Sequence, residues 1–307
     1  MTLRRAKFSL VMFAVVAGGL IAWMTPKVID SGGIASGRCP IAVPESGASP
    51  TIVLIDSAGM VDPDVVDVES QYPRPNTNGR QISLHATAMA SLVSACAPDA
   101  RIIAIASGNQ EFQFGVDAVA SLRRAIELKP HVVLVGFGTP VDSTALRAAV
   151  ASAEANDVLI VAPAGNTRAP SALLGDRQGV PLYKWNEPIY PAAYDTVIAV
   201  GALDADHLRS ADFSQDLPYV DVAAPGTSLF LPEELFAEIE LTGTSYAAPQ
   251  VAAIAAIARW IAPDLSAAEL RRLVVATAQP LDQRYSAAGA GVVQPLMVLE
   301  SLDEGSE

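Results

Sequence analysis

The chain has 307 residues, 51% of them hydrophobic, and carries 33 acidic against 20 basic side chains, for a formal net charge of −13. This size and apolar content allow a large buried core, whereas the negative charge leaves no basic stripe that could neutralise the phosphates of a nucleic acid. No group of histidines and cysteines has metal-ligand spacing, and no acidic loop has the pattern of a calcium site, so no metal and no cofactor is expected.

A basic segment followed by an apolar run begins the chain. Arg4, Arg5 and Lys7 precede an uncharged apolar stretch from Phe8 to Met24. Such a start is typical of exported chains, and the run is slightly short for a membrane-spanning helix but within the range that can cross a membrane. Residues 1–27 are therefore predicted to be a signal peptide or a membrane anchor. The anchor is favoured because no small-residue cleavage site follows directly, and the charge bias would keep the rest of the chain outside the cytoplasm.

Composition divides the remaining chain into a tether and one domain. Residues 28–48 are rich in Gly, Ser and Pro and predict an extended tether, and residues 49–302 form the folded domain because no linker interrupts them. The two cysteines are Cys39 and Cys96. An exported chain with an even number of cysteines allows a disulfide between them, which would tie the tether to the domain; two free thiols are the alternative.

Strand-like and helix-like runs alternate through the domain, beginning with a continuous β-branched stretch that is typical of a strand buried on both faces. A polar stretch from Tyr72 to Arg80 predicts a surface loop. In chain order, the expected elements are a strand over Thr51–Ile55, a helix over Ala86–Cys96, a strand over Arg101–Ala106, a helix over Val116–Leu128, a strand over Val132–Val135, a helix over Ser143–Ala155, strands over Val158–Val161, Thr196–Val200 and Tyr219–Ala223, a helix from Ser245 to Ile261, and a helix over Ser266–Ala276 that starts with a capping box. This alternation predicts an α/β fold, a parallel twisted sheet with helices on both faces.

Four reactive side chains fall where such a sheet gathers functional residues. Function concentrates beyond the carboxyl ends of parallel strands, and a helix that follows a strand begins at that same edge. Asp56 and Asn166 follow expected strands, while His85 and Ser245 open expected helices. All four are therefore expected on one rim.

Ser245 opens a helix of small and aliphatic residues that is apolar all round and should be buried. A hydroxyl there lies beside the positive end of the helix dipole, which suits a nucleophile whose attack creates an oxyanion. Serine is also a preferred N-cap, so the alternative is that Ser245 only caps its helix. The nucleophile would direct its hydroxyl toward His85, and the cap would direct it back to its own helix. Pro249 is expected in the first turn, where no backbone donor is needed.

Together the four residues make up the parts of acyl-transfer catalysis. A serine hydroxyl needs a base, and imidazole titrates in the right range. The base needs a carboxylate that holds its tautomer, and the tetrahedral oxyanion needs fixed donors such as a side-chain amide and a helix N-terminus. Each residue also has a simpler explanation: Asp56 and Asn166 could form turns, and His85 could be a capping or core histidine. The order Asp, His, Ser is the one known for subtilisin.

Several motifs around these residues, in this order, resemble those of the subtilisin-like serine proteases, the subtilase family, over roughly residues 48 to 300. The segments that carry the resemblance are Ile55-Asp56-Ser57, His85-Ala86-Thr87, Ala164-Gly165-Asn166, Tyr190 to Gly201, Ala224-Pro225-Gly226 and Gly243 to Pro249. The resemblance implies that Asp56 orients, His85 is the general base and acid, Ser245 is the nucleophile and Asn166 is the oxyanion donor. It also implies that the backbone lines the site for the residue preceding the scissile bond at Gly136, Phe137, Gly138, Ala164 and Gly165.

The function implied is that of a serine endopeptidase which hydrolyses polypeptide substrates through an acyl-enzyme, exported and membrane-anchored, or secreted. Three residues depart from the family pattern: Ala86 and Ala58 where glycine is usual, and Gly136 where serine is common. If the methyl group of Ala86 narrowed the cleft, the alternative would be a catalytically impaired fold serving as a binding or scaffolding module. An α/β-hydrolase would need a Gly-x-Ser-x-Gly elbow and the order Ser, acid, His, and neither is present.

Two further expectations concern segments around the domain. The roughly 25 residues between the apolar run and the first strand are too few for the propeptide domain that secreted family members usually carry. The domain is therefore expected to fold unaided or with help in trans. The long segment from Thr167 to Glu187, directly after Asn166, is either a functional cover over the site or a surface excursion packed by its own aromatic side chains.

Overall fold

One parallel sheet organises the domain. The computed structural model describes residues 49–56, 61–62, 70–72, 83–107, 116–166, 187–204, 210–229, 240–281 and 288–304. Within these residues the strands lie in the order β2-β3-β1-β4-β5-β6-β7, and every ladder is parallel. The strands are β1 (Thr51–Asp56), β2 (Ser70–Tyr72), β3 (Arg101–Ala106), β4 (Val132–Val135), β5 (Leu159–Pro163), β6 (Val197–Leu203) and β7 (Val222–Pro225).

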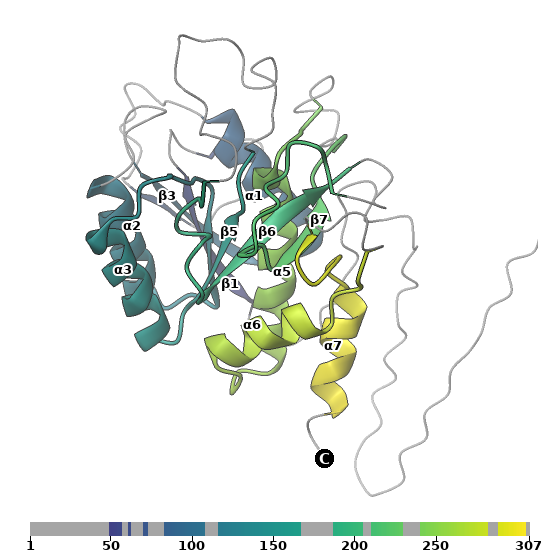
Figure 1. Ribbon diagram of the computed structural model, residues 1–307. Coiled ribbons are helices and arrows are strands. Elements are labelled where there is room, and N and C mark those ends of the chain that lie inside the picture. The colour runs from purple at the N-terminus through teal and green to yellow at the C-terminus, as the bar shows by residue number, and fades with distance from the viewer. Residues whose placement is uncertain are drawn as a thin grey trace, which may run out of the picture.

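Helices cover both faces of this sheet, as the alternating sequence predicts. They are α1 (Leu84–Cys96), α2 (Val116–Glu127), α3 (Thr144–Ala155), α5 (Thr244–Ile261), α6 (Ala267–Ala276) and α7 (Pro295–Glu304). Figure 1 shows α2 and α3 on one side and α5 and α6 on the other. Alternate β1 residues confirm this: Ile52 and Leu54 pack with α1 and α5, whereas Val53 and Ile55 pack with α2 and α3. The predicted fold class is confirmed.

Helix α5 lies at the centre of the larger apolar cluster. Its residues from Ala247 to Ala258 are buried on every side of the helix. Their side chains are mostly small, so the sheet and the neighbouring helices can pack closely against them. Its N-cap is Gly243, which has no side chain to cap the helix, so Ser245 is the second helical residue and not the cap. The placement of Pro249 in the first turn was wrong: it lies inside the helix, where its ring removes the hydrogen bond to the Ser245 carbonyl.

Most expected elements form, with shifted ends and two omissions. The capping box of α6 is present, with Ser266 and Glu269 bonded reciprocally, and Ser143 caps α3. Two elements were not predicted from the sequence: β2, which has three residues, and α7, which begins at a proline. The last strand begins later than predicted, at Val222, since Tyr219 lies in a turn closed by the bond from Val220 N to Leu217 O at 3.0 Å.

Several expectations fall outside the described residues. These are the apolar segment at residues 8–24, the tether at 28–48 with Cys39, the turn at residues 57–59 and the segment at 167–186. None of the helices in the described part of the chain is both long and apolar enough to cross a membrane. Cys96, the expected partner of Cys39, is completely buried at the end of α1, and no cysteine is free among the described residues.

Candidate active site

The carboxyl edge of the sheet carries all four of the predicted reactive side chains. Asp56 is the last residue of β1, and Asn166 follows β5 by three residues. His85 and Ser245 are each the second residue of their helix, α1 and α5. Parallel strands end together and the helices start beside them, so residues far apart in the chain meet on this edge.

Asp56 and His85 form a close pair. Nδ1 of His85 lies 2.6 Å from Oδ2 of Asp56, whose side chain is almost fully buried, while the His85 side chain is 35% exposed. When Nδ1 donates to this carboxylate, the neutral ring keeps Nε2 as an acceptor on its other side. Burial alone would lower the pKa of His85, but the charge of Asp56 and the hydrogen bond to it outweigh burial and raise the pKa above 6.5. The pair therefore holds one tautomer and stabilises the imidazolium.

Asn166 is held against the start of α5 by its side-chain oxygen. Oδ1 accepts from the backbone N–H of Thr244 at 2.9 Å and from the Thr244 hydroxyl at 2.8 Å. The backbone N–H can only donate, so the amide must present its oxygen there and turn its NH₂ group the other way. That NH₂ group lies near Gly243, where a Cβ would be 3.2 Å from Nδ2. Asn166 thus caps α5 while keeping two N–H donors available at the site.

Ser245 is bracketed by these two groups. The residue before it, Thr244, bonds Asn166, and the ring of Tyr246 after it lies 5.6 Å from the His85 ring, centroid to centroid. In the described part of the chain the Ser245 hydroxyl makes no hydrogen bond, neither to its own helix nor to His85. The cap alternative is therefore wrong. The expected bond to His85 is also not formed here; catalytic hydrogen bonds often tighten only when substrate is bound.

Tyr246 forms one side of the His85 environment. Burial, followed by the nearby charge of Asp56, raises the pKa of Tyr246 to about 12, so its hydroxyl stays neutral. Its ring is tilted by 50° against the imidazole. A neutral aromatic ring limits the directions in which His85 can turn without adding a charge that would compete with Asp56. Tyr246 belongs to the motif from Gly243 to Pro249, but no role was predicted for it from the sequence.

Two of the departures from the family pattern have a structural explanation. The Ala86 side chain is 1% exposed and packs in the core below the sheet edge, so its methyl group does not line a cleft. A Cβ at Gly136 would lie 2.7 Å from Oδ2 of Asp56 and 2.8 Å from Sδ of Met89. Met89, on α1, occupies the space that a serine side chain would need. Neither change removes a group that the chemistry requires.

The predicted substrate-lining backbone lies beside this constellation. Gly136 continues the sheet, since its N–H donates to the Ile55 carbonyl at 2.8 Å. Ala164 is completely buried, Phe137 is 7% exposed, and the Gly165 N–H donates to the Thr244 hydroxyl at 3.3 Å. The segments 136–138 and 164–166 therefore stand next to Asp56 and the start of α5, respectively.

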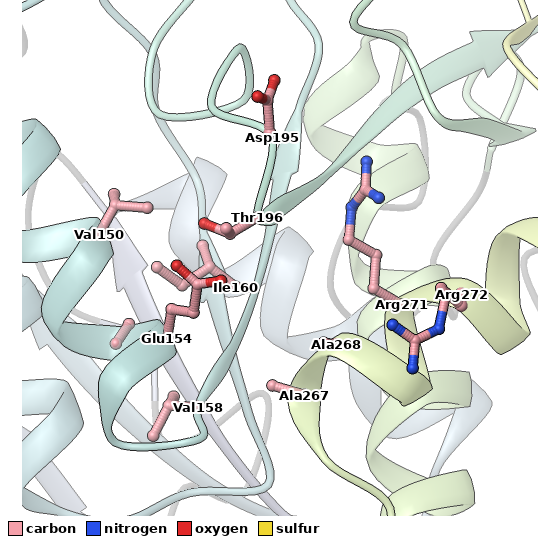
Figure 2. A pocket seen from close by; sticks show the side chains of 11 residues that line it. Val150, Glu154, Val158, Ile160, Asp195, Thr196, Ala267, Ala268, Arg271 and Arg272 are labelled. Carbon is pink, nitrogen blue, oxygen red and sulfur yellow. The ribbon is translucent and has the colours of Figure 1, made fainter.

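A separate cavity of about 300 Å³ lies at the opposite edge of the sheet, where β5 and β6 begin. Figure 2 shows Glu154 and Asp195 on one side of it and Arg271 and Arg272 of α6 on the other, over an apolar floor. Arg271 is already paired with Asp221 and with the Val197 carbonyl. None of the four predicted catalytic residues lines this cavity, so its size does not mark the reactive edge.

Comparison with solved structures supports the fold. The prenylagaramide maturation protease PagA superimposes with a TM-score of 0.66 and 21% identity, covering 82% of this chain and 93% of PagA. The MycP3 protease from the type VII (ESX-3) secretion system superimposes with a TM-score of 0.60 and 28% identity, covering 82% of this chain and 83% of MycP3. Both share the subtilisin-like arrangement of the sheet and its helices.

Sequence comparison identifies the family. The model of the Subtilase family matches residues 39–293, and the chain belongs to that family. Subtilisin DY of Bacillus licheniformis is 33% identical over 220 residues, which are 68% of this chain and 74% of that protein. The chain is a subtilisin-like serine protease, a hydrolase of peptide bonds.

Proposed function

We propose that the protein is a serine endopeptidase in which Ser245 is the nucleophile, His85 the general base and acid, Asp56 the orienting carboxylate and Asn166 an oxyanion donor. The observation that carries the proposal is the 2.6 Å contact of His85 with Asp56, next to a helix start whose second residue is Ser245. Family membership and the bond of Asn166 to Thr244 support the same assignment.

The geometry supports a two-step acyl transfer. Oγ of Ser245 attacks the peptide carbonyl carbon while Nε2 of His85 accepts the hydroxyl proton. The carbonyl oxygen becomes an oxyanion, for which the NH₂ group of Asn166 and backbone N–H groups at the start of α5 supply donors. The C–N bond then breaks, the amine leaves with the proton from His85, and the acyl group stays on Ser245. Water then attacks the acyl carbon while His85 takes a proton from it, which forms a second tetrahedral intermediate. This intermediate collapses as the bond from the acyl carbon to Oγ breaks, His85 returns the proton to Oγ, and the carboxylic acid leaves.

Covalent labelling tests the chemistry. A fluorophosphonate should phosphonylate wild-type protein at Ser245, and Ser245→Ala should abolish both labelling and cleavage of a peptide substrate. Ser301→Ala is the matched control, because it removes a hydroxyl bonded to the Met297 carbonyl on α7, away from the site. Folded wild-type protein that takes up no label would contradict the assignment and support the scaffolding alternative.

We also propose that the protease acts outside the cytoplasm and is held at the membrane by residues 8–24. The basic start and the apolar run support this, and one similar structure is described as belonging to a secretion system. Full-length protein should sediment with membranes and resist extraction by alkaline carbonate, whereas a chain without residues 1–27 should be soluble. Release of the full-length chain by carbonate would exclude an anchor.

A disulfide between Cys39 and Cys96 is proposed for the exported form. Complete burial of Cys96, with no free cysteine among the described residues, supports it. Peptide mapping without reductant should recover the two cysteines in one cross-linked fragment that reductant separates. Alkylation of Cys39 in unreduced, folded protein would contradict the pairing.

A further inference from the structure

A side chain occupies the gap between the two backbone segments that are expected to line the site for the residue preceding the scissile bond. Ile189 is 2% exposed. A Cβ atom at Gly138 would lie 2.2 Å from Cγ2 of Ile189, and one at Gly165 would lie 2.9 Å from Cγ1. The two glycines thus leave room between them, and the branched end of Ile189 fills it.

This gap lies beside the reacting groups. Gly165 directly precedes Asn166, and its N–H donates to the hydroxyl of Thr244, the residue before Ser245. Gly138 lies two residues after Gly136, whose α-carbon is close to the Asp56 carboxylate. A substrate carbonyl between Ser245 and Asn166 would therefore direct the side chain of its own residue toward the walls that Ile189 joins.

Hydrogen bonds hold Ile189 in place from several directions. The Tyr219 hydroxyl accepts from the Ile189 N–H at 3.3 Å and donates to the Ala164 carbonyl at 2.6 Å, which ties Ile189 to the wall at 164–165. Tyr190 exchanges two backbone bonds with Thr139, of 2.7 and 2.8 Å, which tie the same segment to the other wall. The Ile189 carbonyl also accepts from Ala193 N.

These hydrogen bonds fix the position of Ile189 in the site, so that it does not move aside for a substrate. Moving the backbone of this segment would break hydrogen bonds to both walls at once, and each broken bond would leave a buried or half-buried polar group without its partner. A larger substrate side chain would have to displace packed atoms, which close-packed interiors resist.

We propose that Ile189 makes this subsite shallow and restricts the protease to polypeptides with a small residue, glycine, alanine or serine, directly before the scissile bond. The inference rests on the proposed function. The volume of the substrate side chain before the scissile bond decides whether a substrate fits. Methyl-sized side chains fit above Ile189, whereas aromatic side chains need the space that its branched end occupies.

Matched peptide substrates test the proposal. Two peptide p-nitroanilides that differ only by Ala or Phe before the scissile bond are compared with full-length wild type, Ile189→Gly and Ile189→Ala. Wild type should cleave the Ala substrate with the higher kcat/KM. Ile189→Gly should raise kcat/KM for the Phe substrate by about 10- to 200-fold, the range typical of small volume changes in an apolar pocket, and Ile189→Ala by less. Ile261→Ala, a truncation at the end of α5, should leave the ratio unchanged.

Labelling of Ser245 separates failure of this inference from failure of the proposed function. Absence of labelling in folded wild type would refute the function itself. A labelled wild type with equal kcat/KM for the Phe and Ala substrates would refute the role of Ile189. A labelled Ile189→Gly protein whose ratio of kcat/KM for the two substrates equals that of wild type would refute it too. If both Ile189 variants fail to fold, the wild-type ratio alone decides the matter.

Discussion

The starts of α1 and α5 invite comparison, because each carries a proposed catalytic residue as its second helical residue. Helix α1 is capped by its own chain: the Ser83 hydroxyl accepts from the Ala86 N–H at 3.0 Å. Helix α5 begins at Gly243, and its cap comes from Asn166, 78 residues away from Thr244 in the chain. The same need for a partner at a helix start is met locally in one helix and across the fold in the other.

The difference between the two caps shows that a capping side chain can have a second function. Ser83 has one hydroxyl, which is used at the start of α1, and His85 takes its partner from β1. Asn166 has an acceptor and two donors, so it binds α5 by its oxygen and keeps its NH₂ group for an oxyanion. A side chain at position 243 could not replace it, since φ there is 153° and a Cβ would crowd Nδ2 of Asn166.

The largest expected effect comes from the partner of His85. In Asp56→Asn the amide would donate to Nδ1, so the proton of the neutral ring would lie on Nε2, where it cannot accept the serine proton. We expect kcat to fall by about 10⁴-fold, as is typical when this carboxylate becomes an amide. Steady-state kinetics measures it, and thermal unfolding by circular dichroism checks the fold. A loss of less than tenfold would show that β1 does not orient His85.

The same variant should also change the dependence on pH. In wild type, kcat/KM should rise with pH through a midpoint above 6.5, because the pKa of His85 is raised and the base must be neutral. In Asp56→Asn only burial remains, so the midpoint should move to lower pH. The ion pair between protonated His85 and Asp56 makes its full contribution to the free energy of unfolding below pH 6.5. This contribution is lost as the pH rises through the raised pKa of His85. A midpoint unaffected by the substitution would contradict the stated cause of the shift.

Two substitutions at Asn166 separate its roles. Asn166→Asp keeps an oxygen for the Thr244 N–H, and a carboxylate suits a helix N-terminus, so stability should remain near wild type. It loses the donor, so kcat should fall by about 10²- to 10³-fold. Asn166→Ala should show the same kinetic loss and also lower the free energy of unfolding by about 1 kcal/mol, because the cap is gone. Urea denaturation and kcat are measured on both.

The comparison between the two variants is the decisive part. If Asn166→Asp kept full kcat, the amide would not be a donor to the oxyanion. If Asn166→Ala were as stable as Asn166→Asp, the cap across the fold would contribute nothing measurable to α5.

The smallest expected effect is at the local cap. Ser83→Ala should lower the free energy of unfolding by about 1 kcal/mol, as is usual for the loss of an N-cap hydroxyl, while kcat stays close to wild type. Chemical denaturation and steady-state kinetics test both parts. A large loss of kcat without loss of stability would show that Ser83 acts on His85 directly, and the contrast with Asn166 would then disappear.

Much of this site could be predicted because strand ends and helix starts leave local signals. The β-branched run before Asp56 indicates a buried strand, and the small residues after Ser245 indicate a buried helix. The cap of α1 had a signal that was missed, since Ser83 stands just before the apolar run. Strand β2 has none, because three residues carry no periodicity, and it forms only by pairing with β3.

By itself the sequence determined the α/β class, the order of the main elements and the rim that carries Asp56, His85, Asn166 and Ser245. Those properties follow from periodicity and from the rule that parallel strands end at one edge. Only the tertiary structure decided that Asn166, rather than Ser245, caps α5, and that Ile189 fills the gap between Gly138 and Gly165. Both depend on which atoms of distant segments come within bonding or packing distance, and that distance is set by the packing of the whole sheet.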